Sequence, residues 1–260
     1  MKIAADIVGR AIEADEQQVD KRWLMAYSAG LGETAYPHAL FPVCYEWPAT
    51  RLLRERAGLV PIDARLVHAQ HDLIIHRPPR EETLFISGKV VAALQRKPGV
   101  LVVYRFETRD AKGEPVSTTD FSALYRGARL EGADRVLDKV EDPPKHSQAL
   151  KPAGEIQVAA TAAHVYTECA RIWNPIHTDV DYARAAGLPD IILHGTATLA
   201  LSVSKLGMKS VRRIRCRFAG MVTMPSTLTV HASREGDSIA FETRDAKGRA
   251  VIERGWMCVT

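Results

Sequence analysis

Alternating apolar and polar positions predict β-strands in both halves of the chain. Along residues 213–218, Ile214, Cys216 and Phe218 alternate with three arginines, which is the period of a half-buried strand. This alternation favours solvent exposure for Arg213, Arg215 and Arg217, with phosphate binding as the alternative. Eight segments have strand-like patterns: 66–75, 84–94, 100–110, 116–125, 211–222, 228–234, 238–245 and 250–259.

One predicted helix is apolar or small on nearly every side. Residues 191–206 read IILHGTATLALSVSKL, a composition that indicates a helix buried all round. A short helix is expected at 179–186, with Thr178 or Asp179 as its cap and Gly187 at its end. In the amino-terminal half, the helix expected at 47–57 is shorter and charged.

An eight-residue repeat divides the chain into two similar units. The string FETRDAKG occurs at 106–113 and again at 241–248. In each copy AspAlaLysGly is a turn signal between two predicted strands. A stretch rich in proline and polar residues, 142–155, has the composition of a linker. We therefore expect an amino-terminal repeat over residues 1–145, degenerate and on the substrate side, and a carboxyl-terminal repeat over 146–260.

These elements predict an α+β protein. An antiparallel sheet wrapped around a long buried helix is the description of a hot-dog fold, and two copies make a double hot-dog. The long buried central helix is expected in the carboxyl-terminal half, which would also carry the functional site.

Composition changes this picture little. The 35 basic residues are spread along the chain against 31 acidic ones, and the net charge of +4 favours a mixed solvated surface over nucleic-acid binding. No apolar run approaches the roughly 18 residues of a membrane span, and the first residues are not those of a secretory signal, so a cytoplasmic location is expected. Four scattered cysteines form no CxxC pair and favour reduced thiols: Cys44, Cys169, Cys216 and Cys258.

A polar turn carries the first candidate chemistry. Asn174 precedes Pro175, which keeps Asn174 out of the helical region. If Pro175 opens a turn, Asn174 and His177 face the same side. An amide and an imidazole on one rigid turn can handle a water or a carbonyl, while the alternative is a structural histidine beside a proline turn.

A second candidate feature is the glycine that follows His194 near the start of the buried helix. Gly195 has no side chain, so a substrate could approach its backbone N–H closely. The amino-terminal end of a helix favours negative charge and could stabilise an enolate oxygen. Tight packing of helix against sheet is the alternative role for this glycine.

The two features together resemble a known signature. NPIHTD at 174–179, followed by ILHGTAT at 192–198, is similar to the motif of (R)-specific enoyl-CoA hydratases and MaoC-like dehydratases. The resemblance extends to RFAGMVTMP at 217–225, and in the amino-terminal half to YSAGLG at 27–32 and VHAQHDLIIHRP at 67–78. It therefore covers most of residues 25–260.

The resemblance implies reversible addition of water to a trans-2-enoyl thioester, giving a 3-hydroxyacyl thioester. It makes His177 the general acid and base, lets Asn174 hold the site or the water, and lets the Gly195 N–H bind the thioester oxygen. It implies an acyl-CoA substrate, a homodimer and no cofactor; no metal is indicated, because the histidines lack ligand-like spacing. Expected substrate contacts are Ile172, Trp173, His194 and Arg217.

The motif departs from the family at one catalytic position. Ile172 stands where the family has an aspartate, and Arg171 where it has a glycine. Glu168 is the nearest candidate for a substitute acid. Otherwise the reaction needs only His177, or the chain is a non-catalytic acyl-CoA-binding protein. A thioesterase is disfavoured, because residues 196–206 contain no acidic side chain.

Overall fold

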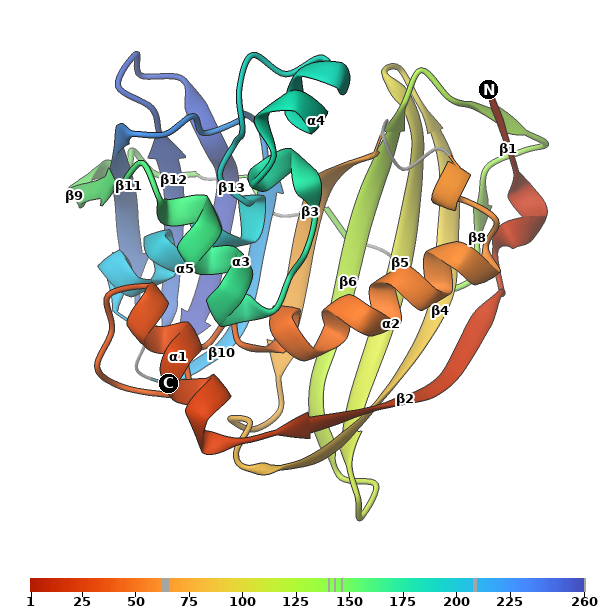
Figure 1. Cartoon of the computed structure of the whole chain (residues 1–260), viewed down its shortest axis with the longest axis horizontal. Coiled ribbons are helices and arrows are strands. Elements are labelled where there is room, and N and C mark those ends of the chain that lie inside the picture. Colours follow the sequence, from red (N-terminus) through yellow and green to blue (C-terminus); the bar gives the residue numbers. More distant parts are fainter. Residues whose placement is uncertain (62–65, 140, 143, 146, 208–209, 260) are drawn as a thin grey trace.

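The computed structural model describes residues 1–61, 66–139, 141–142, 144–145, 147–207 and 210–259. Ten strands follow one another across a continuous sheet, with helices α2 and α5 on the same face (Figure 1). The helices are α1 (Lys21–Gly30), α2 (Pro42–Arg56), α3 (Ala162–Ala170), α4 (Val180–Ala185) and α5 (Gly195–Leu206), with the 3₁₀ turns η1 (Ala5–Ile7) and η3 (Pro175–His177).

The strand order repeats once along the chain. The amino-terminal half contributes β2-β4-β5-β6-β3 and the carboxyl-terminal half β10-β13-β12-β11-β9 in mirrored order. The sheet strands are β2 (Ala11–Val19), β3 (Leu66–Ile75), β4 (Glu82–Arg96), β5 (Gly99–Asp110), β6 (Pro115–Arg126), β9 (Lys151–Val158), β10 (Val211–Phe218), β11 (Ser226–Glu235), β12 (Ser238–Arg244) and β13 (Ala250–Val259). Short strands β1 (Lys2–Ala4) and β7 (Arg129–Glu131) pair with each other, and β8 (Arg135–Val136) pairs with β4.

This topology confirms the predicted α+β double hot-dog fold. Of the ten strands in this order, one precedes the central helix and four follow it in each half, and the halves join through antiparallel pairing of β3 with β10. The repeated octapeptide forms the same turn twice: the side chains of Asp110 and Asp245 each accept hydrogen bonds from the backbone N–H groups two and four residues later. Gly113 and Gly248 close these turns with φ of 83° and 75°. The domain boundary at residue 145 stays a prediction.

Both central helices differ from their predicted bounds. α2 begins at Pro42 rather than at residue 47, and its buried residues include Tyr45 and Glu46, so the amino-terminal half has a long central helix of its own. Pro42 occupies the first turn, where a missing N–H costs nothing. α5 begins at Gly195 rather than at residue 191, because Ile192 forms a β-bridge with Thr223 and the chain there is extended.

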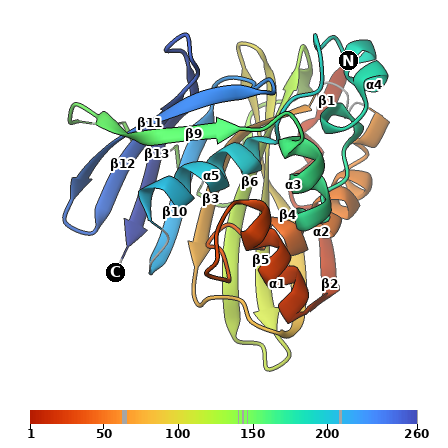
Figure 2. The same ribbon diagram turned by 60° about the vertical axis from the view of Figure 1, so that its left-hand side comes forward.

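The short helix expected at residues 179–186 forms as α4, with the predicted capping residues at its ends. Asp179 caps α4 by accepting from the Tyr182 N–H, and Gly187 follows the helix with a positive φ. Two helices from different halves pack together: α1 lies beside α3 (Figure 2), where the Trp23 indole N–H donates to the Cys169 carbonyl over 3.1 Å.

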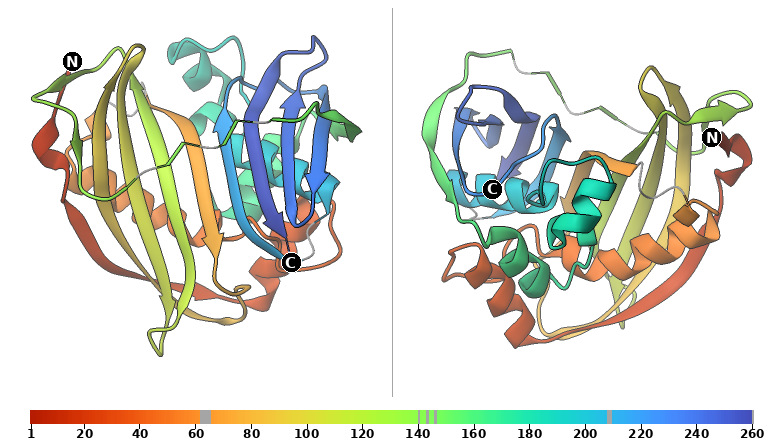
Figure 3. Two further views of the ribbon diagram at one scale, coloured as in Figure 1. Left: turned by 180° about the vertical axis from the view of Figure 1, so that it is seen from behind. Right: turned by 45° about the horizontal axis from the view of Figure 1, so that its top comes forward.

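The arginines of β10 were expected to be exposed to solvent, and this expectation fails for one of them. Arg215 is only 8% exposed, and its Nε lies 3.0 Å from Asp72 Oδ2 on β3. Arg213 also pairs with Asp72, and Glu141 approaches both arginines. The described parts of the segment between β8 and β9 pass over this face of the sheet (Figure 3). Solvent exposure was therefore the wrong prediction for Arg215, because a central strand faces covered surfaces on both sides.

None of the helices within the described ranges has both the length and the apolar character to cross a bilayer.

Candidate active site

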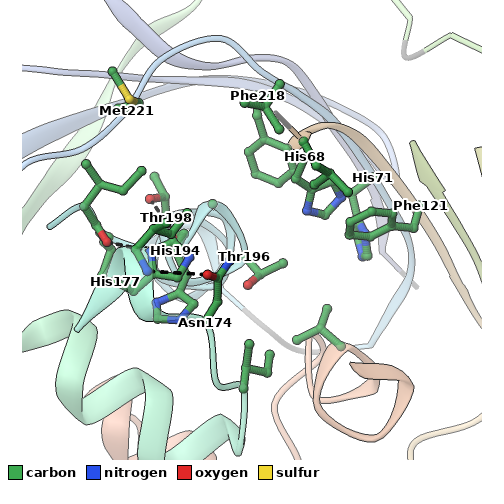
Figure 4. A pocket seen from close by; sticks show the side chains of 18 of the residues that line it. His68, His71, Phe121, Asn174, His177, His194, Thr196, Thr198, Phe218 and Met221 are labelled. Atoms are coloured by element: carbon green, nitrogen blue, oxygen red, sulfur yellow. Dashed lines mark hydrogen bonds between the residues drawn. The ribbon is translucent and has the colours of Figure 1, made fainter. Parts of the chain in front are cut away.

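A cavity of about 470 Å³ lies where the two halves meet. Residues of α2, β3 and β6 form its amino-terminal wall, and the turn before α4, the start of α5 and the end of β10 form its carboxyl-terminal wall (Figure 4). Residues from both walls enter the argument below: Glu46, His68, His71 and Phe121 from one, and Ile172, Asn174, His177, His194, Gly195 and Phe218 from the other.

His177 is held in one orientation at the carboxyl-terminal wall. Asn174 caps η3 through its side-chain oxygen, and the turn places the His177 ring against the extended chain at Ile192. The Ile192 carbonyl lies 2.7 Å from His177 Nδ1 and can only accept, so Nδ1 carries the proton and Nε2 has the free lone pair. Burial lowers the pKa of His177 to about 4, so the ring is neutral at neutral pH.

His194 forms the layer behind His177. The rings stack with centroids 3.6 Å apart (Figure 4). His194 is 3% exposed, and burial, together with the neighbouring His177, lowers its pKa well below the usual value. Its Nδ1 is buried without a protein partner, and its Nε2 lies 3.4 Å from Thr167 Oγ1. The pair therefore offers nitrogen lone pairs without a permanent charge.

Gly195 begins α5 directly after His194 and lines the cavity. A Cβ added there would lie 3.2 Å from the Phe218 ring, so the glycine also lets β10 approach the helix. Both roles considered for this residue are compatible with its position. The first N–H groups of a helix have no partner within the helix and concentrate positive potential at that end.

Asn174 and Ile172 also lie where the motif predicts. Asn174 lines the cavity next to His177, although its side-chain oxygen is 3.4 Å from the Ile176 N–H and serves the turn as well. Ile172 is 5% exposed and lines the same wall. The position at which the sequence resemblance implies an aspartate is therefore inside the cavity and apolar.

Three predicted site residues lie outside the cavity lining. Glu168, the candidate substitute acid, is exposed on α3, whose buried face carries Tyr166 and Thr167, so the structure does not bring it to the cavity. Trp173 is 59% exposed, because it follows the inward-facing Ile172 in a non-helical segment. Arg217 is exposed and pairs with Glu253 over 3.3 Å, since strand alternation turns it away from the side of Phe218.

The amino-terminal wall contains titratable residues that sequence reasoning missed. Glu46 on α2 is 3% exposed, and its Oε1 accepts hydrogen bonds from Ser117 and Thr119 of β6. Burial raises the pKa of Glu46 to about 8. Glu46 supplies the one carboxyl among the described lining residues. A lone charge in the apolar run FPVCYEWPA was the available signal.

His68 and His71 of β3 were missed as well, although both lie in the stretch that carried the resemblance. His71 is 2% exposed, and neither ring nitrogen has a hydrogen-bond partner. Despite these histidines, no three histidine, cysteine or acidic side chains converge as a metal-ligand set within the described ranges.

Comparison with known proteins agrees with the fold and with the motif. Residues 141–254 match the family model described as "MaoC like domain". Peroxisomal multifunctional enzyme type 2 of Mus musculus is 28% identical over 79% of this chain, and its Drosophila melanogaster counterpart is 26% identical over 95%. The chain spans 29% and 45% of the length of these two relatives. Peroxisomal enoyl-CoA hydratase 2 of Arabidopsis thaliana is 24% identical over 74% of the chain and 67% of its own length.

Solved structures show the same fold over nearly the whole chain. A MaoC-like dehydratase from Phytophthora capsici superposes with a TM-score of 0.80 at 19% identity, covering 98% of both chains. The full-length Drosophila melanogaster enzyme gives a TM-score of 0.74 at 23% identity, covering 96% of this chain and 48% of its own. The whole chain therefore has the double hot-dog fold, and its residues 141–254 are similar to a MaoC-like domain.

Proposed function

We propose that this chain is a hydro-lyase that acts reversibly on trans-2-enoyl and 3-hydroxyacyl thioesters of coenzyme A. One observation supports this proposal above the others: the neutral imidazole of His177 and the start of α5 at Gly195 line the same cavity. His194 links them, because it stacks on His177 and directly precedes Gly195. The names of the relatives, which include an enoyl-CoA hydratase and a 3-hydroxyacyl-thioester dehydratase, support the same reaction.

In the hydration direction His177 acts first as a base. Its Nε2 takes a proton from water while the water oxygen forms a bond to C3 of the enoyl group. The electron pair of the C2–C3 double bond moves toward the thioester oxygen, which becomes an enolate. The hydrogen bond from Nδ1 to Ile192 keeps the ring in the required tautomer.

The start of α5 stabilises the enolate. The Gly195 N–H and the positive end of the helix face the developing negative charge, and this charge is largest in the transition state. The enolate then collapses, and the imidazolium returns its proton to C2. The net result is addition of one water with His177 restored, and dehydration follows the reverse path.

Because Ile172 occupies the position of the expected aspartate, another group has to orient the water. Ile172 cannot hold a water, and Glu168 lies outside the cavity lining. We assign orientation of the water to the amide of Asn174 and the unpartnered Nδ1 of His194, both of which lie beside His177. His177 is then the single general acid and base of the reaction.

Loss of enoyl-thioester absorbance on addition of protein tests the proposal directly. His177→Ala is expected to lower kcat by at least ~100-fold, as for removal of a general base. His164→Ala is the matched control, because His164 is an exposed histidine on α3 outside the lining residues, and turnover should be unchanged. Equal turnover in the His177 variant, or release of free thiol without loss of the enoyl absorbance, would reject the proposal.

The position of Ile172 supports a second candidate. A chain that kept the fold and cavity but lost its catalytic carboxylate would be a non-catalytic acyl-CoA-binding protein. Calorimetry that shows tight binding of an enoyl-CoA ester, with no turnover across chain lengths, would favour this binder over the hydro-lyase.

We also propose that the protein is a cytoplasmic homodimer that takes part in fatty acid metabolism. The free thiols of all four cysteines support a reducing compartment, and the resemblance to hot-dog proteins supports the dimer. Light scattering of the purified chain and fractionation of cells that express it would test the two points separately.

A further inference from the structure

The amino-terminal wall of the cavity carries polar groups that the proposed hydration does not use. Both ring nitrogens of His71 and the Nε2 of His68 are buried and have no hydrogen-bond partner. Both residues line the cavity. Buried polar atoms without a hydrogen-bond partner cost free energy. A pair of such histidines in a cavity wall therefore indicates a bound group that supplies their missing hydrogen bonds.

The two histidines lie across the cavity from the reacting groups (Figure 4). The His68 ring stacks on Phe121 at 3.9 Å and contacts Phe218 at 4.5 Å between ring centroids. Phe218 also packs against Gly195, where an added Cβ would be 3.2 Å from the ring. The Phe218 ring therefore lies between His68 and the start of α5. If the carbonyl of an acyl chain is bound at Gly195, only carbons several bonds beyond that carbonyl can reach the histidines.

Glu46 extends the same wall. His71 pairs with Phe121 across β3 and β6, and the next inward-facing pair along these strands is Leu73 with Thr119. The Thr119 hydroxyl donates to Glu46 over 2.8 Å. Glu46 and His71 are thus neighbours on one polar strip of an otherwise apolar wall formed by residues such as Phe106, Phe121 and Leu124.

The charges of His71 and Glu46 determine which kind of ligand this polar strip can bind. Burial lowers the pKa of His71 to about 4 and raises the pKa of Glu46 to about 8, so both groups are neutral at pH 7. A neutral imidazole offers one N–H donor and one lone pair, and a protonated carboxyl offers a donor and an acceptor. A hydroxyl or ketone oxygen of a ligand can form hydrogen bonds with such groups. A carboxylate or an ammonium group would leave a charge in a low-dielectric wall, at a high cost.

Building on the proposed function, we propose that His71, with His68 and Glu46, forms a subsite for a neutral oxygen function on the acyl chain. The substrate class is then enoyl-CoA esters whose acyl part carries a hydroxyl or ketone beyond the reacting carbons. Plain hydrocarbon acyl chains of equal length are the poorer substrates.

Paired enoyl-CoA esters of equal length test this subsite, one member with a hydroxyl or ketone at successive distal carbons and the other without. At the best position we expect kcat/KM for the oxygenated ester to exceed that for its partner by ~10-fold or more, the usual effect of leaving buried polar groups unpaired. His71→Leu should bring this ratio close to one.

Two further variants make the result interpretable. His71→Asn keeps a donor and an acceptor and should retain part of the preference. His76→Leu is the control, because His76 is an imidazole at the end of β3 whose Nε2 already meets Thr118 in an exposed position, and its ratio should equal that of the parent protein. Thermal melting of each variant reports folding separately from the ratio.

The outcomes separate the two proposals. A ratio of one or below in the parent protein, or a ratio that His71→Leu leaves unchanged, would overturn the subsite while leaving the hydro-lyase intact. Absence of hydration with every ester of both series would instead overturn the hydro-lyase.

Discussion

The imidazole rings of His177 and His194 stack face to face, with centroids 3.6 Å apart and planes inclined by 25°. A proton on either ring would oppose a proton on the other, and burial disfavours both cations. Burial thus keeps His177 neutral and ready to accept a proton. The stack also connects the Asn174 turn to the start of α5, so two sequence motifs form one wall of the cavity.

The first prediction concerns the acid limb of the pH profile. Since burial lowers the pKa of His177 from 6.5 to about 4, the base stays unprotonated well below neutral pH. We expect kcat/KM to be flat between about pH 6 and 8 and to reach half its plateau near pH 4 to 5. The measurement is initial hydration rate at low substrate concentration in buffers that keep the protein folded. A midpoint near 6.5 would mean that a solvated group acts as the base.

The second prediction concerns the contact between Gly195 and Phe218. Gly195→Ala keeps the helix N–H but places a methyl group 3.2 Å from the Phe218 ring, which lines the cavity and must shift by a few tenths of an ångström. We expect kcat/KM to fall by ~10-fold or more, because small displacements in a catalytic wall are costly. Phe218→Leu in the same chain should restore part of the loss. Full activity in Gly195→Ala alone would show that the contact has no effect on the reaction.

A third prediction concerns Ile172, the position at which the sequence resemblance implies an aspartate. Ile172→Asp places a carboxylate in the cavity lining, and we expect kcat on a simple enoyl-CoA ester to rise by ~10-fold or more if orientation of the water limits the reaction. The variant should also unfold more easily, by about 1–3 kcal/mol, because the position is buried. Turnover and urea unfolding are measured on the same sample, with Ile172→Asn as the uncharged control. No gain in turnover would indicate that the chemistry does not depend on this carboxylate.

The fourth prediction concerns the stability contributed by Glu46. Its pKa is raised to about 8 in the folded protein, whereas the unfolded chain has the ordinary value of 4.5. Between these values the folded protein binds the proton more tightly, so this residue makes the protein less stable as pH rises from about 4.5 to 8. Glu46→Gln removes the effect, and its stability relative to the parent should grow by up to ~1 kcal/mol per pH unit in this window.

Thermal or urea unfolding at pH 5, 6.5 and 8 measures this slope. Glu168→Gln is the matched control, because Glu168 is exposed on α3 and its substitution should give a difference that does not vary with pH. A difference for Glu46→Gln that is equally independent of pH would show that its carboxyl is ionised throughout.

The sequence by itself determined the architecture and one wall of the site. The repeated octapeptide and the strand periods depend on local turn and pleat geometry, so they indicated two similar units. NPIHTD with ILHG pointed to His177, Asn174 and Gly195, which line one cavity. The helix in the amino-terminal half was predicted too short, because the prediction rested on its charged second part and left out the largely apolar residues that begin α2.

Only the tertiary structure decided which residues lie across the cavity from this carboxyl-terminal wall. Pairing of β3 with β10 places His71 opposite Cys216, one residue before Arg217 and two before Phe218, and so brings a distant strand to the cavity. The same alternation turns Arg217 outward, and the α3 surface leaves Glu168 exposed. Spacing along a chain tells which residues share a face, but the meeting of two faces depends on the register between strands far apart in sequence. Glu46 and His71 therefore entered the site only through that register.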